Sequence, residues 1–290
     1  MLIDVILPTF NRAYCLKRTI DSVLSQNYQE LKLYVIDDGS TDETKNLISQ
    51  YQNESRLKYF YQVNKGVSAA RNSGIKMGQA EWIAFVDSDD EWLPNKLQTQ
   101  VDFIKNYPNC QFVHSNEIWI RNGVRVNPKK KFDKSHHDLF RRSLEMCLIS
   151  PSTVMMKKEL CLKHGLFSEE FIVCEDYDLW LKILATEEVG FLSENLIKKY
   201  GGHIDQLSTQ YPAMDFWRIR SMVSLLENSL VSDEMKRSQI KVEIHKKAEI
   251  LLSGFLKHQK LKEYNELKAL LEQSKGLTNF QVSHNFKNEH

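Results

Sequence analysis

The sequence is poor in cysteine, in net charge and in long hydrophobic runs, and each shortage excludes a class of protein. Its 290 residues include five cysteines, an odd number without close paired spacing. Because a disulfide framework or a zinc site needs paired cysteines, the sequence predicts the reduced, mostly buried thiols of a cytosolic protein. These cysteines are Cys15, Cys110, Cys147, Cys161 and Cys174.

Positive and negative charges nearly cancel, with 39 Lys and Arg against 38 Asp and Glu. A nucleic-acid-binding protein commonly carries a basic excess, and an acidic disordered chain carries a large negative charge. The formal net charge of +1 fits neither class, so we expect no nucleic-acid partner. Partners must therefore be inferred from local sites.

No stretch approaches the roughly 18 apolar residues that a membrane-spanning helix needs. Residues 1–8 lack the basic region and long apolar segment of a signal peptide. The sequence predicts a cytoplasmic protein, with a peripheral position at the inner face of the membrane as the alternative. With 42% hydrophobic residues, the chain can bury the core of one large domain with a small appendage.

Strand-like and helix-like patterns alternate at short intervals through the first half of the chain. This alternation predicts an α/β fold with a mostly parallel, doubly wound sheet and helices on both faces. Further strands are expected at Leu192–Tyr200 and in a hairpin near Phe112–Ile120. The predicted strands of the first half are Leu2–Leu7, Leu31–Ile36, Leu57–Tyr61 and Trp82–Val86, with helices after Asn11, Asp42, Gly66 and Pro94.

Polar segments follow three of these strands: Pro8–Arg12, Asp37–Ser40 and Asp87–Asp90. Ligands of a doubly wound sheet bind outside the carboxyl ends of its strands. We therefore expect the three segments to meet at one edge and form a shared site.

The segment Asp87-Ser88-Asp89-Asp90 places three carboxylates within four residues. Packed acids repel one another unless water or a cation compensates them. Oxygen ligands at this density suit Mg²⁺ or Mn²⁺. The alternative is a solvated acidic turn that caps the helix near Pro94.

The pattern weakens at 121–142, which is predicted to be a loop. Its pair His136-His137 lacks further metal-ligand spacing and is interpreted as part of a solvated loop. Beyond Pro212 three amphipathic helices are predicted. They are expected to pack against the main domain or to form a homo-oligomer. Contact with a membrane surface through Lys241, Lys246 and Lys247 is the alternative.

Five segments in order resemble the family-2 glycosyltransferases of the GT-A fold. The resemblance covers about residues 2–210 and implies a GT-A domain over 1–211, followed by a helical region over 212–290. The matching segments are Leu7–Arg12, Asp37–Asp42, Lys65–Asn72, the Asp-X-Asp element Asp87–Asp90, and Glu175-Asp176 with Trp180 following.

The resemblance implies a nucleotide pocket at the strand ends. In it Asp38 would accept a hydrogen bond from the base, with capping by the Asp37–Ser40 turn as the alternative. Arg71 would balance the diphosphate, or form an ion pair with the acidic cluster. The implied nucleotide-binding residues are Pro8, Thr9, Asn11, Arg12, Asp38, Arg71, Asp87 and Ser88.

The resemblance also implies the metal and catalytic residues. Asp89 would ligate Mn²⁺ or Mg²⁺, and His203 would contact the metal or the diphosphate. Gly201-Gly202 replaces the basic residue usual in the family before this His, which leaves the phosphate contact open.

The pair Glu175-Asp176 supplies the implied acid–base chemistry, because a carboxylate can take the acceptor hydroxyl's proton. Asp176 would be the catalytic base, and Glu175 would orient it or contact the acceptor. The alternative is that both carboxylates only favour a helix N-terminus. Asp90 is predicted to cap the next helix, and Trp180 to be core.

These features predict a metal-dependent inverting glycosyltransferase of the hexosyltransferase type. Its donor would be a nucleotide-diphosphate sugar, most simply a UDP-sugar, and its acceptor a carbohydrate, a lipid-linked sugar or a protein in polysaccharide, glycolipid or glycoprotein synthesis. A sugar-1-phosphate nucleotidylyltransferase is one alternative, although Pro8–Arg12 stands where that class has a Gly-rich loop. A non-catalytic scaffold that binds nucleotide sugars is the other.

Overall fold

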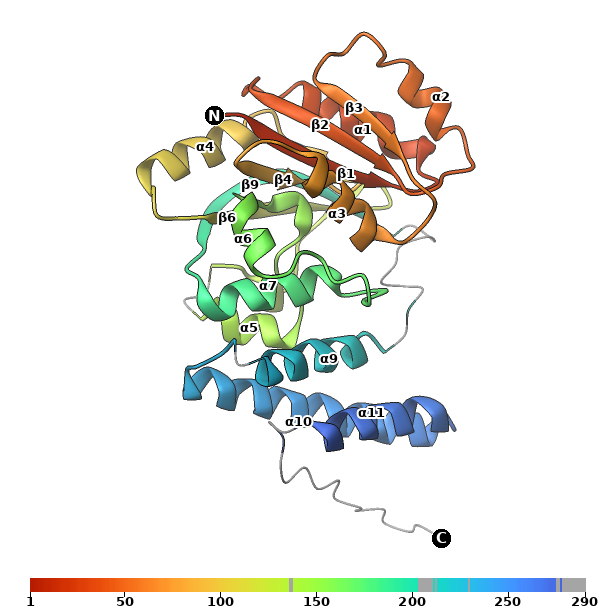
Figure 1. The fold of residues 1–290 in the computed structure, drawn as a ribbon, viewed down its shortest axis with the longest axis vertical. Coiled ribbons are helices and arrows are strands. Elements are labelled where there is room, and N and C mark those ends of the chain that lie inside the picture. Colours follow the sequence, from red (N-terminus) through yellow and green to blue (C-terminus); the bar gives the residue numbers. More distant parts are fainter. Residues whose placement is uncertain (136–137, 203–210, 212, 229, 275–276, 278–290) are drawn as a thin grey trace.

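A mixed nine-stranded sheet organises the described residues, with helices on both of its faces (Figure 1). The computed structural model describes residues 1–290 except 136–137, 203–210, 212, 229, 275–276 and 278–290. The strand order is β3-β2-β1-β4-β8-β6-β9-β5, with β7 paired to β6.

The first half of the chain forms the parallel part of the sheet, as predicted. β1 lies between β2 and β4 and all of its residues are buried, which explains its nearly continuous apolar sequence. The elements are β1 (Ile3–Thr9), α1 (Ala13–Leu24), β2 (Leu31–Asp37), α2 (Thr44–Ser49), β3 (Leu57–Tyr61), α3 (Val67–Met77), β4 (Trp82–Phe85), β5 (Glu91–Trp92) and α4 (Lys96–Asn106).

The second half of the sheet is mixed rather than parallel. β8 runs antiparallel to both β4 and β6, whereas β9 runs parallel to β6 along most of its length. The predicted loop at 121–142 contains β7, the turn η1 and the start of α5. The elements are β6 (Phe112–Arg121), β7 (Val124–Val126), η1 (Lys130–Phe132), α5 (Leu139–Glu145), η2 (Pro151–Thr153), β8 (Met155–Lys157), α6 (Lys158–Lys163), α7 (Glu175–Thr186) and β9 (Gly190–Gly201).

Alternate residues of β1 belong to two different hydrophobic clusters. Val5 and Leu7 belong to a cluster with residues of α1 and α4 on one face. Ile6 belongs to a cluster with residues of α7 on the other face. This alternation follows from the two-residue period of a strand. The sheet is therefore covered on both faces, and the predicted fold class is confirmed.

The three predicted C-terminal helices are present as α9 (Met214–Glu227), α10 (Glu234–Lys257) and α11 (Leu261–Gln273). They are stacked beyond α5 and α7 (Figure 1) and share one hydrophobic cluster with α7. The buried Lys247 of α10 donates from Nζ to Asp215 Oδ1 at 2.9 Å and to the Glu145 carbonyl at 2.9 Å. Lys247 thus links α10 to both α9 and α5 through hydrogen bonds.

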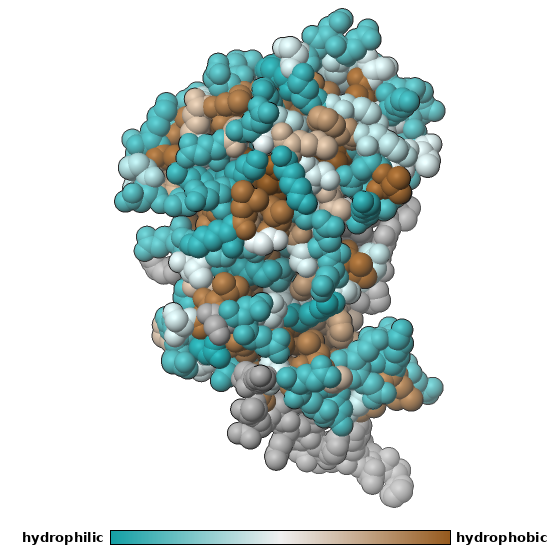
Figure 2. All heavy atoms as spheres, in the orientation of Figure 1, coloured by the Kyte–Doolittle hydropathy of each residue, from teal (hydrophilic) through white to brown (hydrophobic). Residues whose placement is uncertain are grey.

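The face drawn in Figure 2 is mostly hydrophilic, with hydrophobic side chains in small separate groups. None of the helices among the described residues combines the length and apolar character that a membrane crossing requires. All five cysteines are free, with Cys15, Cys161 and Cys174 buried and the other two partly buried. Trp180 is 2% exposed and lies in the core, as predicted.

Two helical glycines provide a matched test of the packing between α3 and the sheet. A Cβ on Gly74 would lie 2.7 Å from Ile6 Cγ2, whereas a Cβ on Gly254 would meet nothing within 4 Å. Gly74→Ala should therefore lower the free energy of unfolding by about 1–3 kcal/mol through overpacking. Gly254→Ala should raise it by about 0.5–1 kcal/mol through helix propensity. Urea denaturation of both variants checks this, and equal effects would contradict the close packing of α3 on β1.

Candidate active site

A cleft of about 760 Å³ opens at the carboxyl ends of the parallel strands, between the sheet and the start of α7. Segments far apart in the sequence line it, including the ends of β1, β2, β4 and β9. The cleft collects every predicted site residue that the structure describes: Pro8, Thr9, Asn11, Arg12, Asp38, Arg71, Asp87, Ser88, Asp89, Glu175 and Asp176. The predicted shared site at one sheet edge is therefore present. His203 lies outside the described residues.

Asn11 ties together the loops that follow β1 and β2. Its backbone has a positive φ of 53°, a conformation that Asn tolerates better than most residues. Its backbone N–H donates to Ser40 Oγ at 2.8 Å, and its side-chain Oδ1 accepts from the backbone N–H of Thr41 at 2.8 Å. The backbone and the side chain of Asn11 thus both join the loop after β1 to the loop after β2.

The carboxylates of Asp37 and Asp38 hold different loops. Asp38 Oδ2 accepts from Gly66 N at 2.8 Å and its Oδ1 accepts from Lys65 N at 3.0 Å. Asp37 accepts from Ser40 N, which closes the turn after β2. Asp38 therefore fixes the backbone just before α3 while its side chain lines the cleft.

Helix α1 makes hydrogen bonds to the backbone of Asp87–Asp90, called the acidic turn below. Thr19 Oγ1 lies 2.8 Å from the Ser88 carbonyl and 2.7 Å from the Asp90 carbonyl. Arg18 Nη2 donates to the Asp89 carbonyl at 2.6 Å. These contacts fix the backbone of the turn, so that the carboxylate of Asp89 lines the cleft, 3.6 Å from Arg12 Nη1.

The prediction that Asp90 caps the next helix is wrong. α4 begins at Lys96, and Asn95 occupies its N-cap position. Asp90 is instead 2% exposed, and its two oxygens accept from Ser152 Oγ at 2.6 Å and Tyr200 N at 3.1 Å. Because Ser152 Oγ also accepts from Asp87 N at 3.0 Å, Asp90 joins the acidic turn to η2 and β9.

Arg71 bridges the two acidic parts of the cleft. Its Nη2 donates to Asp87 Oδ1 at 2.8 Å and its Nη1 donates to Glu175 Oε1 at 2.5 Å. The Arg71 side chain is 4% exposed and that of Glu175 is 8% exposed. Burial raises the pKa of Glu175, and the charge of Arg71 opposes that rise. The ion-pair alternative for Arg71 is thus the one that this structure contains.

Asp176 lies in the first turn of α7 and lines the cleft. The helix begins after Cys174, which has a left-handed backbone with φ of 65°. Asp176 Oδ1 accepts from Tyr177 N at 2.7 Å, and its Oδ2 lies 3.4 Å from the thiol of Cys147. Asp176 is partly exposed, so one side of its carboxylate is available to a ligand.

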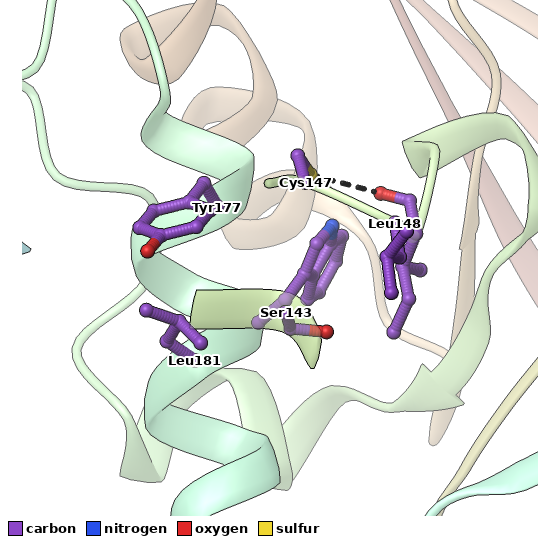
Figure 3. Close-up of a pocket in the computed structure, with 7 residues that line it drawn as sticks. Ser143, Cys147, Leu148, Tyr177 and Leu181 are labelled. Atoms are coloured by element: carbon purple, nitrogen blue, oxygen red, sulfur yellow. Dashed lines mark hydrogen bonds between the residues drawn. The ribbon is translucent and has the colours of Figure 1, made fainter. Parts of the chain in front are cut away.

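Cys147, which contacts Asp176, also lines a small cavity of about 10 Å³ (Figure 3). Cys147, Tyr177 and Leu181 line it, and the Cys147 thiol lies 3.4 Å from the Ile149 carbonyl. Burial and the nearby Asp176 raise the pKa of the Cys147 thiol, so it stays protonated and able to donate. Cys147 therefore supports Asp176 from the protein interior.

Sequence reasoning missed three residues of the site: Cys147, Ser152 and Lys199. The first two belong to the segment before β8, which carries no strand-end signal. Lys199 lines the cleft from β9, and the pair Lys198-Lys199 directly before Tyr200 was the only signal that could have indicated it. Within the described part of the chain, no group of three His, Cys, Asp or Glu side chains could by itself hold a metal ion.

Comparisons with known proteins agree on one family. The family model described as "Glycosyl transferase family 2" matches residues 4–165. An Escherichia coli protein named UDP-Glc:alpha-D-GlcNAc-diphosphoundecaprenol beta-1,3-glucosyltransferase WfgD is 34% identical over 194 residues, which cover 66% of this chain and 73% of that protein. An uncharacterized glycosyltransferase of Rickettsia felis is 33% identical over 202 residues, covering 68% of this chain and 32% of its own length.

The chain spans only 28–63% of the length of five Rickettsia relatives that it matches. Among solved structures, Staphylococcus aureus TarS 1-349 in complex with UDP-GlcNAc has a TM-score of 0.76 at 22% sequence identity. The alignment covers 93% of this chain and 80% of that one, and it shows a common fold.

The bridge through Arg71 can be tested by a double-mutant cycle. Arg71→Met leaves two carboxylates without their buried partner and should lower the free energy of unfolding by about 3–5 kcal/mol. Glu175→Gln in the same chain should recover about 1 kcal/mol or more, because one unpaired charge is removed. Urea denaturation of the single and double variants gives the coupling energy, and strict additivity would contradict the bridge.

Proposed function

Because the chain belongs to glycosyl transferase family 2, we propose that it transfers a sugar from a nucleoside-diphosphate donor to an acceptor hydroxyl with inversion at the sugar carbon. The observation that carries this proposal is the cleft itself. It places the acidic turn of Asp87 and Asp89 opposite the pair Glu175-Asp176, with Arg71 between them. One acidic group is thus available to the leaving diphosphate and the other to the attacking hydroxyl.

The donor that we propose is a UDP-sugar. WfgD takes UDP-Glc by its name, and the TarS structure contains UDP-GlcNAc, so two similar proteins support a uridine nucleotide. In this chain Pro8, Thr9 and Asp38 line the cleft at the ends of β1 and β2. An Asp38 oxygen with spare acceptor capacity would bind the imide N–H of uracil.

The acidic turn fits a divalent metal that is held partly by the substrate. Mg²⁺ and Mn²⁺ are commonly bound by one or two carboxylates together with phosphate oxygens and water. Asp89 would be the main protein ligand, with Asp87 beside it and His203 as the proposed contact from the segment after β9. When bound, the ion would neutralise negative charge on the leaving diphosphate.

Asp176 is the proposed catalytic base. The acceptor oxygen attacks the donor sugar C1 as its proton passes to an Asp176 oxygen, and the C1–O bond to the phosphate breaks with its electrons leaving on the nucleoside diphosphate. The hydrogen bonds from Tyr177 N and the Cys147 thiol orient the carboxylate for this transfer. Glu175 is held by Arg71 and would position the acceptor side of the cleft.

The proposed acceptor is a carbohydrate carried on a lipid, as the name of WfgD states for that protein. The acceptor side of the cleft has an apolar lining that includes Phe171, Ile172 and Met214, and Ile172 is 52% exposed. Such a lining would tolerate the first part of a lipid carrier near the membrane surface. With it we propose a peripheral position at the inner face of the membrane and a boundary between the catalytic and helical regions near residue 211.

Asp176→Asn provides the test of the base. The variant should keep the wild-type affinity for UDP while sugar transfer falls by about 10²–10⁴-fold, because the amide cannot accept the proton. Binding is followed by calorimetry and transfer by UDP release with a lipid-linked acceptor. Glu169→Gln, at the rim of the same cleft, is the matched control and should retain transfer. Transfer at the wild-type rate by Asp176→Asn would remove the base assignment.

Asp89→Asn tests the metal. In the wild type, Mn²⁺ should increase the thermal stabilisation by UDP-sugars, since a ligand that binds only the folded state raises its stability. In Asp89→Asn this increase should be lost, whereas Asp102→Asn, an exposed change on α4, should leave it intact. An unchanged Mn²⁺ effect in Asp89→Asn would refute the ligand assignment. If no nucleotide sugar stabilises the wild type, the transferase proposal fails, whereas donor binding without transfer would favour the non-catalytic scaffold.

A further inference from the structure

The last residues of β9 place two neighbouring lysines in different environments. Lys198 Nζ pairs with Glu91 Oε1 at 2.7 Å, and its side chain is 35% exposed. Lys199 points to the opposite side of the strand, as the two-residue period requires, and lines the cleft. Its Nζ donates to Ser150 Oγ at 2.6 Å. Among the described residues, no carboxylate lies within the 4 Å that would make an ion pair with it.

The other cations that line the cleft are already engaged or lie at its rim. Arg71 uses its two terminal nitrogens on Asp87 and Glu175. Arg12 contacts Tyr14 and Asp89. Lys65 is exposed. Lys199 differs from all three, because an ammonium has three donors and this one spends a single donor on a neutral hydroxyl.

The surroundings of Lys199 keep it charged. Burial acts to lower its pKa, but the carboxylates of Glu117, Asp90 and Asp87 outweigh burial and raise the pKa above its ordinary value. Asp90 also accepts from the backbone N–H of Tyr200, so the strand end that carries Lys199 is fixed against the acidic turn. The ammonium therefore stays close to the place where the proposed metal and diphosphate would lie.

We propose that Lys199 binds the diphosphate of the donor and stabilises the nucleoside diphosphate as it leaves. A diphosphate brings negative charge into a cleft that already contains Asp87 and Asp89. One divalent cation would not balance these charges, and a second cation with free donors completes the compensation. This role rests on the proposed function, since it requires a nucleoside-diphosphate donor in the cleft.

The test compares UDP with UMP, which lacks the second phosphate, in calorimetric titrations at one fixed Mn²⁺ concentration. Lys199→Met should weaken UDP binding by about tenfold or more, the effect expected for loss of a charged hydrogen bond. It should change UMP binding by less than about threefold. Lys199→Arg should recover most of the UDP affinity because it keeps the charge. In the transfer assay, Lys199→Met should lower kcat more than it raises the KM of the acceptor.

Lys198→Met is the matched control, because it makes the same change at the preceding residue of β9. It should leave the ratio of UDP affinity to UMP affinity unchanged. Binding of UMP also reports that each variant is folded. If wild type binds both nucleotides and Lys199→Met keeps their ratio, the role of Lys199 is refuted while the donor assignment stands. If wild type binds neither nucleotide, the donor assignment fails and the role of Lys199 fails with it.

Discussion

The site depends on the guanidinium of Arg71, which holds two carboxylates from opposite sides of the cleft. Asp87 comes from the end of β4 and Glu175 from the start of α7, 88 positions later in the chain. Glu175 and Arg71 could not be buried here without partners, because the desolvation of an unpaired charge costs several kcal/mol, whereas Asp87 stays partly exposed. The pairing therefore fixes the distance between the acidic turn and α7. It also fixes the width of the cleft between them.

The same requirement of charge compensation explains the layers around the bridge. Asp90 is buried beside Asp87 and Asp89, and the donors Ser152 and Tyr200 satisfy its oxygens. These two contacts connect the acidic turn to two further elements, since Ser152 belongs to η2 and Tyr200 to β9. The parallel half of the sheet presents the acidic turn, and the mixed half supplies the groups that keep it in place. Groups from both halves of the fold therefore satisfy the acids of the cleft, as Ser152 and Tyr200 do for Asp90.

The sequence allowed the strands whose ends line the cleft to be predicted well. Apolar runs that end in polar segments indicated β1, β2 and β4 within two residues, and parallel strands necessarily bring such ends to one edge. Asp90 was assigned wrongly, because its partners Ser152 and Tyr200 are 62 and 110 positions away and no local pattern encodes such pairings. The contact of Cys147 with Asp176 was missed for the same reason. The antiparallel β8 is only three residues long, too short for a periodic signal.

The match to the family model ends at residue 165, before the start of α7 at Glu175. Glu175 and Asp176 begin α7, whose buried face shares a hydrophobic cluster with α9, α10 and α11. Asp178, two residues after Asp176, accepts from Ser221 Oγ of α9 at 2.8 Å, and Met214 of α9 lines the cleft itself. A change in the packing of α9 would therefore reach the start of α7 and, through the bridge of Arg71 between Glu175 and Asp87, also the acidic turn. The C-terminal helices thus help to hold the start of α7 at the cleft.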